Sequence, residues 1–147
     1  MENLHMPLLS GLLGGALLVL QIALMLSVGM YRVGARKGVG VDGDAKLERL
    51  VRRHGNLSEN AAIFVTVFAL YELIFGQTIL AMMMGAAFFV ARLAHITGFS
   101  NMAGSHLVEA QGGGRFYVLM RSVGAGLTAL SGLGLGIALV VSILLHI

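Results

Sequence analysis

The chain has 147 residues, of which 57% are apolar and 12% are charged, and its formal net charge is +3 at pH 7. A soluble domain carries about 25% charged and about 45–50% apolar residues. The composition therefore excludes an ordinary soluble enzyme and a disordered chain, and it is typical of a polytopic membrane protein, because the apolar residues form long uncharged runs. No cysteine is present, which excludes a disulfide, a thiolate metal site and a cysteine nucleophile.

The first apolar run predicts a membrane span over residues 6–31. Its dense part, from Leu8 to Met30, is long enough to cross a bilayer with some tilt. Pro7 suits the first helical turn, where its missing N–H costs nothing. A cleaved signal peptide is the alternative, but the segment before the run contains Glu2 and no Lys or Arg, so we expect it to be retained.

Two spans, over residues 48–75 and 77–97, are expected in the middle of the chain. Asp44 is the predicted N-cap of the helix that enters the membrane here. The apolar run that follows is too long for one span, and Gly76-Gln77 in its middle predicts a turn. Glu72 lies near that turn, where we expect it to be solvated, with a proton-coupled role as the alternative.

Polar side chains should gather at the membrane face opposite this turn. Each apolar arm is too short to cross alone, so both helices must extend beyond it and carry polar residues just within the membrane. Polar side chains at that depth are expected to look into the bundle. They are Asn56, Glu59, Arg92 and His95.

The last span is expected over residues 118–146. Gly132 and Gly136 form a small-xxx-small pair, as do Gly11 and Gly15 in the first span. Such pairs predict close helix contacts, within the bundle or between copies of the chain, and glycines facing lipid are the alternative. The glycine-rich loop over residues 100–114 is either a mobile flap or a plain linker.

The distribution of Lys and Arg supports four spans. With four spans all ten lie on one side of the membrane, in or beside loops 32–47 and 98–117, whereas three spans would split them seven against three. The positive-inside rule makes that side cytoplasmic and places both termini outside. We therefore predict an all-α integral membrane protein whose single transmembrane domain covers residues 1–147.

A set of polar residues at the charged helix ends could bind a small anionic peptide. Arg52, Asn56 and Glu59 have i, i+4, i+7 spacing and share one helix face. Guanidinium groups bind carboxylates, and a carboxylate binds an ammonium group, so a peptide with two carboxylates and one amine would suit them. The alternative is that these residues serve topology, headgroup contacts and helix association. Other members of the set are Arg92 and His95, one turn apart, with Arg121 and Arg32 at the ends of the last and first spans.

Three ordered motifs resemble the MAPEG family, the membrane-associated proteins in eicosanoid and glutathione metabolism. Residues 52–59 contain the R-x-x-x-N-x-x-E pattern of that family, and residues 91–99 and 121–124 with Thr128 resemble segments of its bacterial members. The resemblance implies an up-and-down four-helix bundle that forms a homotrimer. It also implies that glutathione binds between neighbouring protomers near the cytoplasmic face.

The resemblance also implies roles for individual residues. Glutathione would be held by Arg52, His54, Asn56, Glu59 and His95, and the catalytic residues near its thiol would be Arg121 and Arg92. Arg32, at the end of the first span, is a further candidate to bind a carboxylate of glutathione, although no motif contains it. Three positions depart from the common pattern, because Asn60 stands where many members have Tyr, Ala62 where Pro is common, and Phe99 where some active members carry a hydroxyl.

The sequence thus points to a glutathione transferase or peroxidase that acts on lipophilic electrophiles in a bacterial inner membrane, with glutathione as co-substrate. A non-catalytic lipid-binding or scaffold relative is the alternative. A small drug or ion exporter also has four spans, but such exporters need a carboxylate in the first span, and this one has none. We expect no metal and no nucleic-acid partner.

Overall fold

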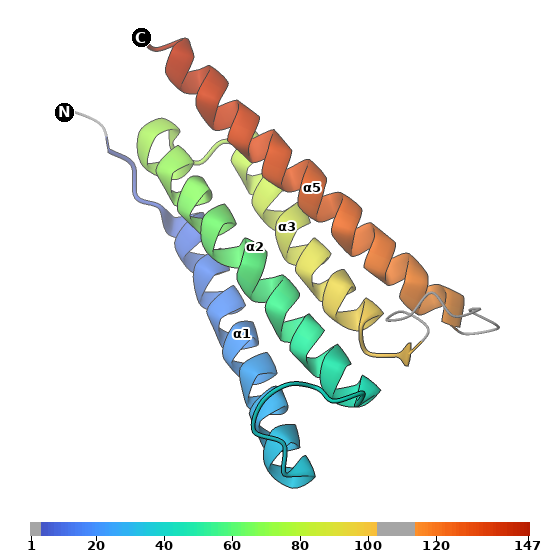
Figure 1. Cartoon of the computed structure of the whole chain (residues 1–147). Helices are drawn as coiled ribbons and strands as arrows, with labels where there is room; N and C mark the ends of the chain where they lie inside the picture. Colours follow the sequence, from blue (N-terminus) through green and yellow to red (C-terminus); the bar gives the residue numbers. More distant parts are fainter. Residues whose placement is uncertain (1–3, 103–113) are drawn as a thin grey trace.

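The computed structural model describes residues 4–102 and 114–147 and places four helices in these ranges (Figure 1). All four are long and apolar enough to cross a membrane. They run up and down, with both termini at the same end of the bundle (Figure 1). The predicted all-α four-helix bundle is therefore confirmed, while the homotrimer stays a prediction. The helices are α1 (Leu8–Ala35), α2 (Ala45–Phe75), α3 (Ile79–Gly98) and α5 (Gly114–Leu144).

Each expected span overlaps one of these helices. The helices extend past the expected cytoplasmic ends of the spans, since α1 continues to Ala35, α2 begins at Ala45 and α5 begins at Gly114. Most of the loop over 100–114, for which a flap and a linker were the alternatives, lies outside the described residues.

Asp44 caps α2, as predicted. Its Oδ1 accepts hydrogen bonds from the backbone N–H groups of Lys46 at 3.1 Å and Leu47 at 3.0 Å. The bond from Leu47 is the main reason why the pKa of this carboxyl lies below its ordinary value, and the Tyr31 hydroxyl and the Lys37 ammonium group add to the effect. Because Tyr31 belongs to α1, the cap also joins the polar ends of α1 and α2.

The predicted turn between the middle spans is also confirmed. Helix α2 ends at Phe75, and Gly76 follows with a φ of 74°, which only glycine adopts at low cost. The Thr78 side chain then accepts a hydrogen bond from the Ala81 N–H and caps α3. The turn is too short to separate the helices, so α2 and α3 run antiparallel side by side (Figure 1).

Glu72 is not solvated, which corrects the expectation from the sequence. Its side chain is 0% exposed, and its two carboxylate oxygens accept hydrogen bonds from Leu9 N at 3.1 Å and Ser10 N at 2.6 Å. These amides belong to the first turn of α1, where Pro7 provides no side-chain cap. Because the N-terminal end of a helix is positive, a carboxylate from α2 caps α1 favourably.

Helices α3 and α5 approach each other closely through glycines. A Cβ atom on Gly98 would lie 2.7 Å from Arg121 N, and one on Gly124 would lie 2.7 Å from His95 N. Neither position can carry a side chain without a shift of the backbone. These glycines therefore hold the polar halves of α3 and α5 in contact, where the candidate site residues lie.

The two glycine pairs singled out in the sequence make no such contact within the chain. A Cβ atom on Gly11, Gly15, Gly132 or Gly136 would have nothing within 4 Å. The expectation that these pairs form seams inside the bundle is therefore wrong, and a seam between copies stays a prediction. Helix spacing alone does not tell which glycines face a neighbouring helix.

The core lies between α1, α2 and α3 and includes one buried side chain of α5, Leu135. The rings of Phe64 and Phe88 stack with their centroids 3.8 Å apart. Phe68 packs against Gly85, where a Cβ atom would lie 2.7 Å from its ring. These aromatic contacts place α2 against α3.

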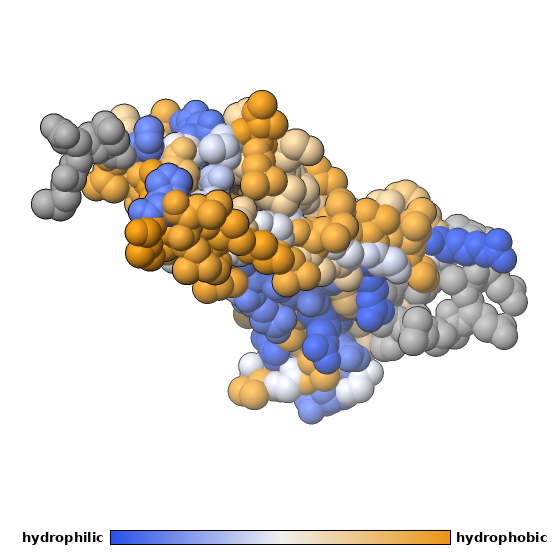
Figure 2. All heavy atoms as spheres, turned by 90° about the horizontal axis from the view of Figure 1, so that it is seen from above, coloured by the Kyte–Doolittle hydropathy of each residue, from blue (hydrophilic) through white to orange (hydrophobic). Residues whose placement is uncertain are grey.

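Charged residues gather at the end of the bundle away from the termini. Arg32 lies in the last turn of α1, Arg52 in the first turns of α2 and Arg121 in the first turns of α5, and these helix ends share one end of the molecule (Figure 1). Figure 2 shows hydrophobic residues over most of the visible face, with a large group of hydrophilic residues on one side. The end of the bundle that carries Arg32, Arg52 and Arg121 is called the polar end below.

Candidate functional site

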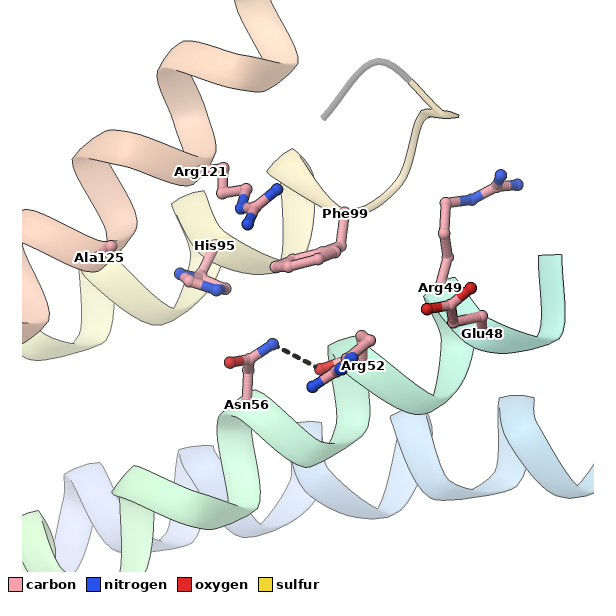
Figure 3. Close-up of a pocket in the computed structure, with 8 residues that line it drawn as sticks. All are labelled: Glu48, Arg49, Arg52, Asn56, His95, Phe99, Arg121 and Ala125. Carbon is pink, nitrogen blue, oxygen red and sulfur yellow. Dashed lines mark hydrogen bonds between the residues drawn. The ribbon is translucent and has the colours of Figure 1, made fainter. Parts of the chain in front are cut away.

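A cleft of about 420 Å³ opens at the polar end between α2, α3 and α5 (Figure 3). One wall is α2, and the other is formed by α3 and α5, which the close glycine contacts hold together. Ligand sites of comparable size, from about 300 Å³ upward, are common in proteins. The cleft is lined by Glu48, Arg49, Arg52, Asn56, His95, Phe99, Arg121 and Ala125.

The mouth of the cleft carries two arginines on opposite walls. Arg52 projects from α2, and Arg121 projects from α5 beside Phe99 at the end of α3 (Figure 3). The Arg121 guanidinium carbon lies 5.0 Å from the centre of the Phe99 ring. Such a cation–π contact fixes the orientation of the guanidinium group. Both walls of the mouth therefore carry positive charge, and the charge on Arg121 is held in place by an aromatic ring.

Asn56 and His95 lie one helical turn deeper. The Asn56 side chain donates to the Arg52 carbonyl on its own helix at 2.9 Å, which leaves its side-chain oxygen available (Figure 3). The His95 ring lies 5.1 Å from that of Phe99, and its Nδ1 is buried with no hydrogen-bond partner among the residues that the structure describes. Because a buried polar atom without a partner is costly, this nitrogen is suited to contact a bound molecule.

Arg92 lies deeper still and joins three helices. It is only 2% exposed, and its Nη1 donates to the Asn56 carbonyl at 2.9 Å. Its Nη2 donates to the Thr128 hydroxyl of α5, and its guanidinium group lies over the Phe88 ring. Arg92 therefore holds α2, α3 and α5 at a fixed separation below the cleft.

Three residues predicted for the site lie elsewhere in this chain. Glu59 is exposed on α2, so the expectation that it looks into the bundle is wrong. His54 faces α1, where its Nε2 lies 2.7 Å from the amide nitrogen of Gln21. Arg32 donates to the carbonyl of Gly40, in the loop before α2, at 2.9 Å. None of the three lines the cleft.

The cleft also contains residues that the sequence analysis missed. Glu48 precedes Arg52 by four residues, so the spacing that joins Arg52 to Asn56 could have identified it. Ala125 lies one turn after Arg121 and carries no chemical signal of its own. Within residues 4–102 and 114–147, no three His, Asp and Glu side chains lie close enough together to hold a metal ion.

The polar end therefore contains a cationic cleft in a four-helix membrane protein, with arginines from α2 and α5 in its lining. Comparison with curated proteins and with solved structures gives no match. The model of the MAPEG family matches residues 10–141, a range that includes all four helices almost completely. The chain therefore belongs to the MAPEG family.

Proposed function

We propose that the protein binds glutathione in the cationic cleft and acts as a glutathione transferase or peroxidase on lipophilic electrophiles. The observation that carries the proposal is the pair Arg52 and Arg121 on opposite walls of a cleft of about 420 Å³. Glutathione has two carboxylates, one amine and two amide groups. Arginines bind carboxylates with paired hydrogen bonds, and Asn56 provides an amide oxygen for the peptide. Membership of a family that includes glutathione transferases supports the same assignment.

Arg121 is the better candidate to activate the thiol. A guanidinium group near a thiol lowers its pKa and favours the thiolate nucleophile. Arg121 lines the open part of the cleft, whereas Arg92 is 2% exposed and has both terminal nitrogens hydrogen-bonded to the protein. In conjugation, the thiolate sulfur forms a bond to the electrophilic carbon, and the leaving group departs with the electron pair of the broken bond. The thiol proton passes to solvent at the mouth of the cleft.

We further propose that a second protomer completes the site in a homotrimer. Glu59 would hold the amine of glutathione and Arg32 a carboxylate, yet neither lines the cleft of its own chain. Glu59 is exposed on a helix apolar enough to span a membrane, where a carboxylate is costly unless it finds a partner. A ligand bound between protomers would provide that partner.

The polar end is proposed to face the cytoplasm of a bacterial cell, because Lys and Arg accumulate on the cytoplasmic side of inner-membrane proteins. The lipophilic substrate would enter laterally from the bilayer, between α2 and α5, where exposed apolar side chains line the bundle. Among them are Ile63 and Leu133.

A non-catalytic lipid-binding relative is the second candidate, and it is favoured by two side chains, Phe99 and Asn60. Phe99 presents a ring without a hydroxyl, and the Asn60 amide donates to the carbonyl of Asn56 on its own helix. Phe99 therefore offers no hydroxyl group to a thiolate beside Arg121. Conjugation activity that disappears in Arg52→Ala protein would remove this candidate.

The test is isothermal calorimetry of glutathione with detergent-purified protein. The wild type should bind at millimolar affinity or better, and Arg52→Ala and Glu59→Gln should each weaken binding by about tenfold, or roughly 1.4 kcal/mol. Arg36→Ala is the control, because Arg36 is an exposed arginine at the polar end that does not line the cleft. Absence of binding by correctly assembled wild-type protein would refute the proposal.

A further inference from the structure

The hydroxyl group of Thr128 is the point at which α5 is bonded to Arg92. Its Oγ1 donates to the Gly124 carbonyl on its own helix at 2.6 Å. A hydroxyl group has one hydrogen to donate, and an arginine side chain has no acceptor, so the Thr128 oxygen accepts the bond from Arg92 Nη2. These roles leave a single arrangement, in which Thr128 both donates and accepts.

Within residues 4–102 and 114–147, no hydrogen bond joins α2 directly to α5. Each helix is bonded instead to Arg92 of α3, α2 through the Asn56 carbonyl at 2.9 Å and α5 through the Thr128 hydroxyl. Because Arg92 is buried, neither bond can be exchanged for one to bulk water, and losing either partner is costly. Arg92 is therefore the polar link between α2 and α5, and Thr128 is the end of that link on α5.

Thr128 lies two turns below Arg121 on the same face of α5. The two residues are seven positions apart, which is about 10 Å along the helix axis. Both walls of the cationic cleft are thus tied to Arg92 below their arginines, since Asn56 follows Arg52 by one turn on α2. A tilt of α5 by about 10° at Thr128 would move Arg121 by about 2 Å. Displacements of about 1 Å near a reacting group can cost about 100-fold in rate.

The close contacts between α3 and α5 do not replace this link. At Gly98 and Gly124 the two helices meet through glycine and backbone atoms. Interlocking ridges of side chains set the crossing angle of packed helices, and glycines present no such ridge. These contacts therefore fix the distance between α3 and α5 and constrain their crossing angle only weakly. The bond from Arg92 to Thr128 supplies the missing constraint toward α2.

We infer that Thr128 is a positioning residue that sets where Arg121 stands across the cleft from Arg52, and thereby how strongly Arg121 stabilises the thiolate of bound glutathione. This inference rests on the proposed function and adds a residue that acts through Arg121, since Thr128 does not line the cleft. Arg52 and Asn56 belong to α2, so their contacts with the peptide do not depend on the tilt of α5. Loss of the Thr128 hydroxyl should therefore impair thiol activation more than binding.

The thiol of bound glutathione reports on the position of Arg121. Its pKa is measured from the ultraviolet absorbance of the thiolate against pH, with detergent-purified full-length protein. Thr128→Val keeps the shape of the side chain, removes the acceptor oxygen and should raise the pKa of the bound thiol by about 1, a tenfold loss of thiolate at a given lower pH. Binding of S-methylglutathione, which has no thiol proton, should change by less than about threefold in calorimetry. Thr128→Ser, which keeps the hydroxyl, should behave as the wild type.

Thr97→Val is the matched control. The Thr97 hydroxyl donates to the Leu93 carbonyl of its own helix at 2.9 Å, and Thr97 does not line the cleft, so the thiol should keep its wild-type pKa. Thr128→Ala is a second variant for the case that Thr128→Val protein does not assemble, and it should show the same rise. An unchanged thiol pKa in protein that binds glutathione would overturn the inference and leave the proposed function standing. A rise as large in Thr128→Ser as in Thr128→Val would also overturn it.

The position of α5 can also be measured without glutathione. The chain has no cysteine, so Lys46→Cys on α2 and Ser122→Cys on α5 can be spin-labelled specifically, and both positions are exposed and outside the cleft. Dilution with unlabelled wild-type chain restricts the measured distances to single chains. Thr128→Val should broaden the distance distribution, and Thr128→Ser should not. An unchanged distribution in Thr128→Val protein would overturn the inference. A broadened one in protein that binds no glutathione would refute the proposed function and support the positioning of α5 by Thr128.

Discussion

Replacing Glu72 with glutamine should destabilise the protein strongly although the shape of the side chain is kept. The Glu72 carboxylate is 0% exposed, and it accepts hydrogen bonds from the backbone N–H groups of Leu9 at 3.1 Å and Ser10 at 2.6 Å. A glutamine retains one acceptor oxygen and turns an NH₂ group toward the other amide. One buried N–H then loses its partner, and the charge that complements the N-terminal end of α1 is removed.

The expected loss is roughly 2–4 kcal/mol in the free energy of unfolding, combining an unsatisfied buried donor with the lost charge at the helix end. It would be measured by denaturant titration of purified protein in detergent, followed by circular dichroism. Glu59→Gln is the control, because it makes the same chemical change at an exposed position of the same helix. Equal stability of the two variants would show that the α1 cap contributes nothing and would refute the reasoning.

Two further predictions concern other contacts of the fold. Gly124→Ala should cost about 1–3 kcal/mol of stability, because its Cβ would lie 2.7 Å from a backbone nitrogen of α3; thermal unfolding should show the loss, and Gly126→Ala should show none. Asp44 has a lowered pKa in the folded protein, so its cap contributes stability that is present above the unfolded pKa near 3.8 and is lost as pH falls through the folded pKa. Between pH 7 and pH 3, Asp44→Asn protein should therefore lose less of its free energy of unfolding than the wild type, because asparagine keeps a capping oxygen but carries no charge. An equal loss in the two proteins would show that the acid sensitivity does not come from Asp44.

Several features of the fold were predictable from local sequence. The four helices follow from long uncharged runs, the turn follows from Gly76, and the start of α2 follows from the capping preference of Asp44. The accumulation of Lys and Arg at one end follows from counting charges between the runs. Each of these depends on residues close together in the chain, where covalent geometry and backbone hydrogen bonding determine the outcome.

The sequence also identified part of the site. Arg52 and Asn56 share a face because they are four residues apart, and His95 and Arg121 were found through motifs, so all four line the cleft. The same spacing grouped Glu59 with them, but Glu59 does not line the cleft of its own chain, and its role in binding stays a prediction. A helix face is broad, and spacing does not tell where the boundary between the cleft and the exposed surface lies.

The tertiary structure alone decided which distant residues meet. Glu72 caps α1 through the amides of Leu9 and Ser10, which precede it by 63 and 62 residues. Arg92 contacts α2 and α5 at once and is thereby buried, and Gly124 rather than Gly132 lies against α3. These contacts depend on the rotation and axial position of each helix relative to its neighbours. That arrangement is set by the packing of the whole bundle, which the pattern of any single helix does not contain.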